Sequence, residues 1–160
     1  AIALHELASI SERRIDRILD HSKSGHPPFL AVLPGIESGL MILQYICAAV
    51  IAEMRVHATP SSTSNIPVSA GQEEHVSMGA TAAWSALLSA RSCALVIAGE
   101  LITATAAIEL IEEEPGRGVQ VIHRWVRGHV SPHTCDRPLG GDIERLAQAL
   151  LAGQLTAVLE

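Results

Sequence analysis

The residues with the clearest chemical potential lie in one polar stretch, Ser69-Ala-Gly-Gln-Glu-Glu-His-Val-Ser-Met-Gly79. Two adjacent carboxylates, Glu73 and Glu74, stand there beside the imidazole of His75. A carboxylate held in a fixed position can bind a cationic group or exchange a proton in general acid–base catalysis. This stretch is therefore the first candidate for a site that faces a ligand.

The same stretch has the composition of a helix start. A loop rich in Ser, Thr and Pro, residues 58–71, ends there and a long apolar segment begins. Ser69 has the residue type of an N-cap, and Gln72 could reach back to the Ser69 amide in a capping box. Glu73 and Glu74 would then meet the positive end of the helix dipole in the first turn. Spacing alone leaves two interpretations of Glu73 open: a structural acid at a helix N-terminus, or a carboxylate facing a ligand.

A second group, His129, His133 and Cys135, has residue types that bind metals. Zinc needs three or four ligands in tetrahedral geometry, and this loop is broken by proline and has no second ligand pair of matching spacing. We therefore predict no metal site. The chain also has no Gly-x-Ser-x-Gly elbow, phosphate-binding P-loop or Gly-x-Gly-x-x-Gly fingerprint.

The elements that must position these residues are predicted to be helices. Aromatic residues make up only 2% of the chain, so its apolar content is Ala, Leu, Ile and Val, which favours helix–helix packing over a β-sandwich or barrel. Apolar residues recur at three- and four-residue spacings. The pattern predicts an all-α fold, an elongated helical bundle with one long central helix. The expected helices are residues 1–20, 37–57, 72–113, 119–129 and 142–151.

Two of these helices, residues 37–57 and 72–113, are apolar on nearly every face. They have the length of membrane spans, but charged and amide side chains interrupt them and no aromatic or Lys/Arg girdles flank them. Burial in a larger helical assembly explains them better than a membrane does. A chain of 160 residues cannot cover both helices by itself, so the sequence predicts a protein partner.

Charge and cysteine content limit the other partners and the compartment. The net charge is −6 and no basic patch follows a helix face, so nucleic acid is not expected to bind. Three cysteines without regular spacing do not suggest a disulfide framework, and the N-terminus is not a signal peptide. We therefore expect a cytoplasmic protein. Because residue 1 is not Met and falls inside a predicted helix, we also expect the biological protein to begin upstream.

Several motifs then identify a family. The stretch from Ser69 resembles Ser-Ala-Asn-Gln-Glu-Asp-His-Val-Ser-Met, a signature of the 4-methylideneimidazole-5-one (MIO)-dependent aromatic amino-acid lyases and aminomutases. Further matches lie in the family's order along essentially the whole chain. They are Ile10-Ser-Glu-Arg-Arg-Ile15, Pro27-Pro-Phe-Leu30, Gly35-Ile-Glu-Ser-Gly-Leu-Met-Ile-Leu-Gln44, and Asp136-Arg-Pro-Leu139 with Asp142-Ile-Glu144.

The resemblance implies that residues 1–160 are a single C-terminal helical segment of a longer, mostly helical homotetrameric enzyme. Its electrophilic cofactor, MIO, would form from an Ala-Ser-Gly tripeptide that is absent here. The expected partners are the MIO-bearing N-terminal part of the same polypeptide, the other subunits and a small aromatic amino acid. The isolated 160-residue piece is expected to be inactive.

By the same resemblance, Glu73 is the catalytic residue that contacts the substrate amine or imidazole and assists proton transfer. Met41 and Gln72 are expected to bind substrate in the same pocket, although Gln72 could also serve only as the helix cap. A carboxylate beside the amine suits ammonia elimination, which removes a weakly acidic proton from the neighbouring carbon.

The implied reaction is the elimination of ammonia from an aromatic L-amino acid, with conversion of L-histidine to urocanate favoured. Gly71, Leu40 and residues 62–65 depart from the histidine-lyase pattern, so a tyrosine or phenylalanine lyase or a 2,3-aminomutase stays as an alternative. A hypothesis of another class is a non-catalytic helical assembly module, in which Glu73 and Glu74 only cap a helix.

Overall fold

The computed structural model describes residues 1–63 and 65–159; Ser64, in the predicted loop 58–71, and Glu160 lie outside the described residues. Within that part the chain is helical and has no β-strand, which confirms the predicted all-α class. The α-helices are α1 (Ile2–Leu19), α2 (His21–Ser24), α3 (Met41–His57), α4 (Gly79–Ile108), α5 (Arg117–Arg127), α6 (Gly140–Leu151) and α7 (Gln154–Leu159). Short 3₁₀ turns are η1 (Pro28–Leu30), η2 (Ser61–Thr63) and η3 (Ser69–Gly71).

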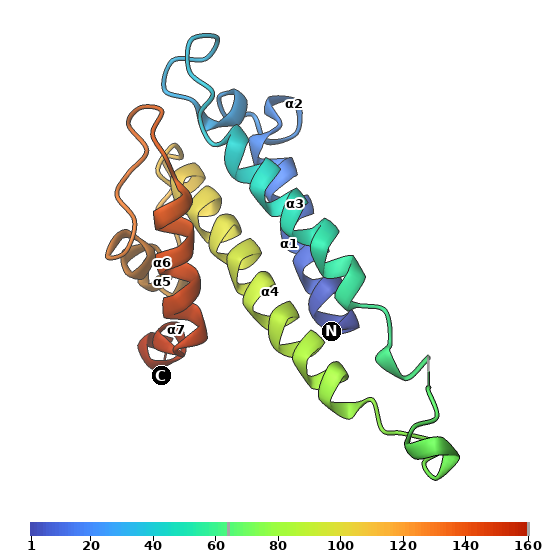
Figure 1. Ribbon diagram of the computed structural model, residues 1–160. Coiled ribbons are helices and arrows are strands. Elements are labelled where there is room, and N and C mark those ends of the chain that lie inside the picture. Colours follow the sequence, from blue (N-terminus) through green and yellow to red (C-terminus); the bar gives the residue numbers. More distant parts are fainter. Residues whose placement is uncertain (64, 160) are drawn as a thin grey trace.

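The long helix α4 is the axis of the molecule. At 1.5 Å per residue its 30 residues span about 45 Å. Helices α1 and α3 pack along one side of α4, and α6 packs on the other with α5 and α7 beside it (Figure 1). The predicted elongated bundle with one central helix is therefore confirmed.

The core lies where the C-terminal two-thirds of α4 meets α1, α3 and α6. Val96, Ala98 and Ile102 of α4 are buried there, together with Ile15 of α1 and Leu43 of α3. Burial of these aliphatic side chains supplies the hydrophobic free energy that holds the layers together.

The helices approach closely at one glycine. A Cβ atom added at Gly99 would lie 2.6 Å from the Sγ atom of Cys47 and 3.2 Å from a methyl carbon of Leu43. Gly99 therefore allows α3 to lie against α4 at a distance that no larger side chain would permit.

The predicted bounds of the long helix are wrong at both ends. Instead of residues 72–113, α4 runs from Gly79 to Ile108. An N-cap residue has extended backbone angles, whereas Ser69 has φ 55°, so the predicted capping box between Ser69 and Gln72 does not form. The amide of Gly79 instead donates to the hydroxyl of Ser77 at 3.3 Å.

The second helix also starts later than predicted, at Met41 rather than residue 37. Gly35 and Gly39 have φ values of 90° and 58°, which interrupt a right-handed helix. The amides of Ser38 and Gly39 donate to the carboxylate of Asp136, a partner far away in sequence. The sequence pattern could not anticipate that tertiary contact.

The remaining helices are closer to expectation. The predicted helices 1–20, 119–129 and 142–151 match α1, α5 and α6 to within about two residues, which is the usual uncertainty of a helix end. Helices α2 and α7 were not predicted, because segments of four and six residues are too short to show a helical period.

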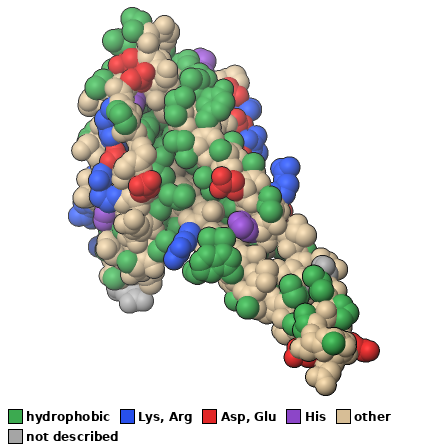
Figure 2. Space-filling view, viewed as in Figure 1, with side chains coloured by type: hydrophobic (Ala, Val, Ile, Leu, Met, Phe, Trp, Pro, Cys, Tyr) green, Lys and Arg blue, Asp and Glu red, His purple; other side chains and the backbone are tan. Residues whose placement is uncertain are grey.

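Large apolar side chains stay exposed on two helices. On α3 they include Tyr45, 65% exposed, and Val56, 72% exposed; on the uncharged first turns of α4 they include Trp84, 59% exposed. The space-filling view shows hydrophobic side chains at the surface along this face (Figure 2). By length and composition alone, residues Met41–Thr63, which include α3, and Gly79–Ile108, which is α4, could each cross a membrane. In α4, however, many of the apolar side chains from Cys93 onward pack in the core. The predicted protein partner stays a prediction.

Candidate active site

The segment that carries Glu73 is a tight loop, residues 68–73. Two main-chain hydrogen bonds close it: the Val68 amide donates to the Glu73 carbonyl at 3.0 Å, and the Glu73 amide donates to the Val68 carbonyl at 3.3 Å. Three of the four residues between them, 69–71, have left-handed backbone, with φ values of 55°, 56° and 86°. For a residue with a Cβ atom this conformation costs on the order of 1 kcal/mol or more, and such strain tends to occur at functional sites.

A side-chain clamp holds the base of this loop. The Asn65 side-chain amide donates to the Val76 carbonyl at 2.6 Å, and its oxygen accepts from the Val76 amide at 3.2 Å. Asparagine suits this position because its side chain carries both a donor and an acceptor. Asn65 and the 68–73 closure together fix the backbone of Glu73 relative to the start of α4.

Glu73 and Gln72 lie at the exposed tip of this loop, which projects beyond the end of the bundle (Figure 1). Within the described residues the Glu73 carboxylate has no hydrogen bond or ion pair. Glu73 precedes α4 by six residues, so the interpretation of Glu73 as a stabilising acid in the first turn of a helix is wrong. So is the interpretation of Gln72 as a helix cap; the ligand-facing roles of both residues stay predictions.

A cleft of about 470 Å³ lies beside the loop, between it and the start of α4. Its lining includes Asn65, His75, Met78 and Ala82. Glu73 and Gln72 are outside this cleft, so their side chains are free to reach a group supplied by another chain segment.

Met41 lies at the first residue of α3 and is half-buried. It lines a second cleft, of about 280 Å³, together with Phe29, Gln44, Tyr45 and the largely buried carboxylate of Glu12. Met41 therefore belongs to a cleft wall rather than to the core of this chain.

The backbone that packs against the turn leading into Met41 is also strained. Phe29 and Leu30 both have φ 55°, and the Phe29 carbonyl accepts a hydrogen bond from the Leu40 amide at 2.9 Å. Gly39 passes so close that an added Cβ atom would lie 2.5 Å from the same carbonyl oxygen. The Pro-Pro-Phe-Leu and Gly-x-x-Ser-Gly motifs thus meet here and set the position of Met41.

The chain does not bring Glu73 and Met41 together. Met41 begins α3, whereas the loop that carries Glu73 follows the other end of that helix, about 25 Å away for 17 residues. Figure 1 shows the loop continuing away from the bundle at that end. A single copy of this chain therefore does not form one pocket from both predicted residues.

The Ser-Glu-Arg-Arg motif is a structural joint between α1 and α4. The hydroxyl of Ser11 and the guanidinium of Arg14 both donate to the carboxylate of Glu100, with Arg14 Nη2 3.1 Å from Oε2. This contact raises the pKa of the Arg14 guanidinium. The sequence identified these residues by motif but gave no sign of their role.

The closing motif of the chain is structural too. The Asp136 carboxylate accepts from the amides of Ser38 and Gly39 at 2.8 and 2.9 Å. The buried carboxylate of Asp142 pairs with the guanidinium groups of Arg137 and Arg145. The Asp136 contacts join the loop before α6 to the turn before α3, and the Arg137–Asp142 pair ties the same loop to α6.

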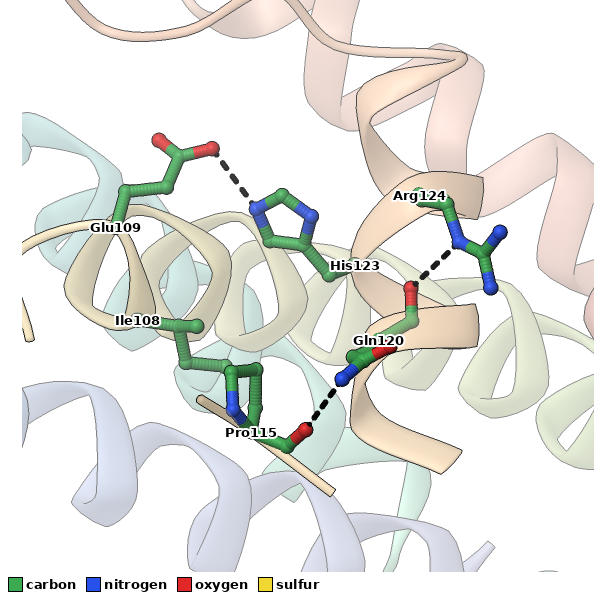
Figure 3. Close-up of a pocket in the computed structure, with 6 residues that line it drawn as sticks. All are labelled: Ile108, Glu109, Pro115, Gln120, His123 and Arg124. Carbon is green, nitrogen blue, oxygen red and sulfur yellow. Dashed lines mark hydrogen bonds and ion pairs between the residues drawn. The ribbon is translucent and has the colours of Figure 1, made fainter. Parts of the chain in front are cut away.

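A third cleft, of about 450 Å³, lies where α4 meets α5 (Figure 3). Glu109 accepts from His123 Nε2 at 2.9 Å and from Arg127 Nε at 2.7 Å. Burial raises the pKa of Glu109, but these hydrogen bonds and charges outweigh it and the net pKa is lowered, so this carboxylate is ionised at neutral pH. The cleft lies at the opposite end of α4 from Glu73, and its polar groups already pair with one another.

The residues considered as metal ligands do not converge. Within residues 1–63 and 65–159 no group of three or more His, Cys, Asp and Glu side chains has a geometry for binding a metal. The ring nitrogens of His129 are 2.9 Å from the Trp125 carbonyl and 3.2 Å from the Gln154 side chain, and Cys135 is exposed.

Comparison with known proteins agrees with this arrangement of motifs. The family model described as aromatic amino acid lyase matches residues 1–128. Histidine ammonia-lyase of Symbiobacterium thermophilum is 42% identical over 100% of this chain and 32% of the relative. The chain thus spans about a third of the length of the curated relatives it matches.

Solved structures extend the similarity to the fold. Histidine ammonia-lyase from Trypanosoma cruzi has a TM-score of 0.91 at 34% identity, covering 97% of this chain and 31% of that structure. Tyrosine aminomutase from Streptomyces globisporus has a TM-score of 0.94 at 30% identity, covering 99% and 31%. With the family model matching four-fifths of its residues, this chain belongs to the aromatic amino acid lyase family.

Proposed function

We propose that this chain is the C-terminal helical part of an MIO-dependent ammonia-lyase that converts L-histidine to urocanate and ammonia in the cytoplasm. The observation that carries the proposal is the similarity to histidine ammonia-lyase along the whole chain, at 42% identity. The clamped, exposed loop at Glu73 supports it, because a catalytic carboxylate must be held in place and yet reach its substrate.

The chemistry divides between this chain and the rest of the enzyme. When present, MIO supplies the electrophile that activates the substrate amine. No Ala-Ser-Gly occurs among the 160 residues, so other residues of the complete protein must form and hold that group. This chain suits such an enzyme because the 68–73 loop presents the carboxylate of Glu73, which has no partner within the described residues and could face a substrate.

Within that enzyme the Glu73 carboxylate holds the substrate amine or imidazole and accepts or returns a proton at its oxygen atoms. The two hydrogen bonds between Val68 and Glu73 and the Asn65 clamp fix the carboxylate before substrate arrives. A pre-positioned group avoids the entropic cost of being ordered in the transition state. Gln72, next to Glu73 on the same tip, contacts the same ligand.

The pocket is composite. Since Glu73 and Met41 lie at opposite ends of α3, a site lined by both must draw them from different copies of the chain. The exposed apolar faces of α3 and α4 give those copies a surface on which to associate. A homotetramer built on these helices would bring Glu73 of one copy to Met41 of another and would also cover the exposed apolar faces.

A tyrosine or phenylalanine lyase, or a 2,3-aminomutase, is the alternative within the family. It is favoured by one observation: the TM-score to tyrosine aminomutase, 0.94, is higher than the 0.91 to the histidine ammonia-lyase structure. An aminomutase would keep Glu73 and the composite pocket but return the amine to the neighbouring carbon.

A chimera tests the proposal. Residues 1–160 would replace the matched third of the Symbiobacterium thermophilum histidine ammonia-lyase, and the product would be offered L-histidine, L-tyrosine and L-phenylalanine. We expect urocanate and ammonia from L-histidine, and no activity from the 160-residue chain alone. Coumarate, cinnamate or a β-amino acid as the principal product would support the alternative.

The chimera also separates a catalytic from a purely structural chain. A folded tetrameric chimera that keeps full activity when Glu73 is changed to Ala would favour the non-catalytic assembly module. A folded chimera with no activity on any of the three amino acids would contradict the proposed function.

A further inference from the structure

Two loops meet at the end of the bundle opposite Glu73. Residues 128–139 join α5 to α6, and residues 31–40 lead into α3 and Met41 (Figure 1). Asp136 connects the two loops through its hydrogen bonds to the Ser38 and Gly39 amides, at 2.8 and 2.9 Å. The position of Met41 thus depends on whether the 128–139 loop stays in place.

His133 is buried within this contact. Its side chain is 5% exposed, and neither ring nitrogen has a hydrogen-bond partner within the described part of the chain. Leaving a buried polar group unpaired costs about 1–3 kcal/mol. An imidazole in this position has no structural pairing that would explain it.

The charged groups around His133 are few. Asp136 is the nearest, with Oδ1 3.9 Å from Nε2, beyond hydrogen-bond distance. Arg137 is on the same loop; its Nη atoms donate to Asp142 and the Ser131 carbonyl, while its buried Nε has no partner within the described residues. Glu37 is on the facing loop and accepts from the Leu33 amide. Asp136 is thus close enough to attract a protonated His133, but both of its oxygens already accept from the Ser38 and Gly39 amides, so pairing with the ring at hydrogen-bond distance would draw it off that turn.

We propose that His133 is a pH-sensitive latch, which holds residues 128–139 against residues 31–40 while its imidazole is neutral and releases them when the imidazole is protonated. An imidazolium must be hydrated or paired. Opening the loop supplies water to the ring, and it also removes Asp136 from the amides of Ser38 and Gly39.

The direction of the pH effect follows from linkage. Burial lowers the pKa of His133, with Asp136 and Glu37 opposing and Arg137 reinforcing that shift. The closed loop thus binds the proton more weakly than the open loop, in which the pKa is near 6.5. The closed state is fully favoured above pH 6.5 and loses this advantage as the pH falls through that value toward the lower pKa of the closed loop.

Hydrogen–deuterium exchange of the complete gene product at pH 7.5 and 5.5, corrected for the intrinsic exchange rate, tests the latch. We expect peptides from residues 33–40 and 129–139 to lose protection at pH 5.5 by up to about tenfold, which is the limit that an open-loop pKa near 6.5 sets at that pH. A peptide from the middle of α4 should not change. Equal protection of both loops at the two pH values would overturn the proposal.

Variants separate His133 from other titrating groups. His133→Phe and His133→Gln should keep the loops protected at both pH values, whereas His57→Gln, on α3 outside both loops, should retain the wild-type pH dependence. Asp136→Asn should loosen the loops at both pH values. Wild-type pH dependence in either folded His133 variant would contradict the latch.

Discussion

At the scale of single residues, the candidate site depends on how Glu73 is held rather than on Glu73 alone. Its carboxylate is exposed and has no partner within the described residues, while its backbone is fixed by Val68 and, one step further out, by Asn65. Because Glu73 lies on a loop and does not cap α4, replacing it should have a different effect from the loss of a helix cap. A side chain that caps nothing can be removed at little cost to folding.

We therefore expect Glu73→Gln in the complete enzyme to lower kcat/KM by about 100-fold to 10,000-fold, the range typical of a lost general acid or base. The midpoint of thermal unfolding should stay within error of wild type. Steady-state kinetics and calorimetry measure the two quantities. Glu74→Gln is the matched control, since it removes a neighbouring exposed carboxylate; equal losses in both variants would argue against a specific role for Glu73.

Asn65 should affect the same loop without touching substrate. Asn65→Ala removes both hydrogen bonds to Val76, each worth about 1 kcal/mol net. We expect faster amide exchange in residues 66–76 and a lower kcat/KM, with the rest of the bundle unchanged. Asn65→Asp keeps the hydrogen-bond acceptor but loses the donor, so its amide exchange rate and its kcat/KM should lie between those of wild type and Asn65→Ala. Amide exchange identical to wild type in Asn65→Ala would show that the clamp is not needed.

At the scale of elements, the strained turns account for both predicted site segments. Non-glycine residues with left-handed backbone occur at residues 69–70, three residues before Glu73, and at residues 29–30, where the Phe29 carbonyl accepts from the amide of Leu40, the residue before Met41. The turn at residues 69–70 keeps Glu73 out of α4, whereas the start of α3 is delayed by the left-handed Gly35 and Gly39. The cost of the strain is consistent with selection for the position of a side chain rather than for stability.

The crossing of α3 and α4 gives a prediction for stability. Gly99→Ala should destabilise the fold by about 1–3 kcal/mol, because the new methyl group would overlap Cys47 Sγ and the helices must separate. Chemical denaturation measures the change. Gly118→Ala in α5 is the control: with open space around it and helical backbone it should be neutral or stabilising by about 0.5–1 kcal/mol. A neutral Gly99→Ala would mean that the helices are less tightly packed there.

At the scale of the whole molecule, the chain has a complete core at one end of α4 and an exposed apolar surface at the other. The first turns of α4 carry no charge and expose Trp84, and α3 exposes large apolar side chains along its length, from Ile42 and Tyr45 to Val56. Exposed apolar patches on a soluble protein often mark surfaces that associate with another chain. An oligomer would bury this surface and would also unite Glu73 of one copy with Met41 of another.

Trp84→Glu tests this assembly. The side chain is 59% exposed in a single copy, so the change should leave the helical content intact and yet place a charge in the proposed subunit interface. We expect light scattering to show dissociation of the tetramer, with loss of activity, whereas Trp84→Phe should remain tetrameric. A tetrameric and active Trp84→Glu enzyme would exclude this face as the interface.

The sequence by itself determined the fold class, the family and the approximate number of long helices. Apolar periodicity is a property of neighbouring residues, so it can be recognised in the sequence without knowledge of distant contacts. The motifs also marked the segments that matter, including Ser69–Gly79 and Gly35–Gln44. The sequence also predicted that the apolar faces of its two most apolar helices exceed what a chain of this length can cover. The exposed apolar side chains on α3 and α4 agree with that prediction.

Tertiary structure decided where the helices begin and which motif residues are structural. The start of α3 depends on Asp136, almost a hundred residues away, and the Ser-Glu-Arg-Arg motif has its partner in Glu100. The reversal of the backbone at residues 69–70 left Glu73 on a loop, where a local pattern of cap and acids had predicted a helix. Long-range hydrogen bonds and left-handed backbone leave little trace in local spacing, so only the folded chain shows that Glu73 and Met41 stand at opposite ends of a helix.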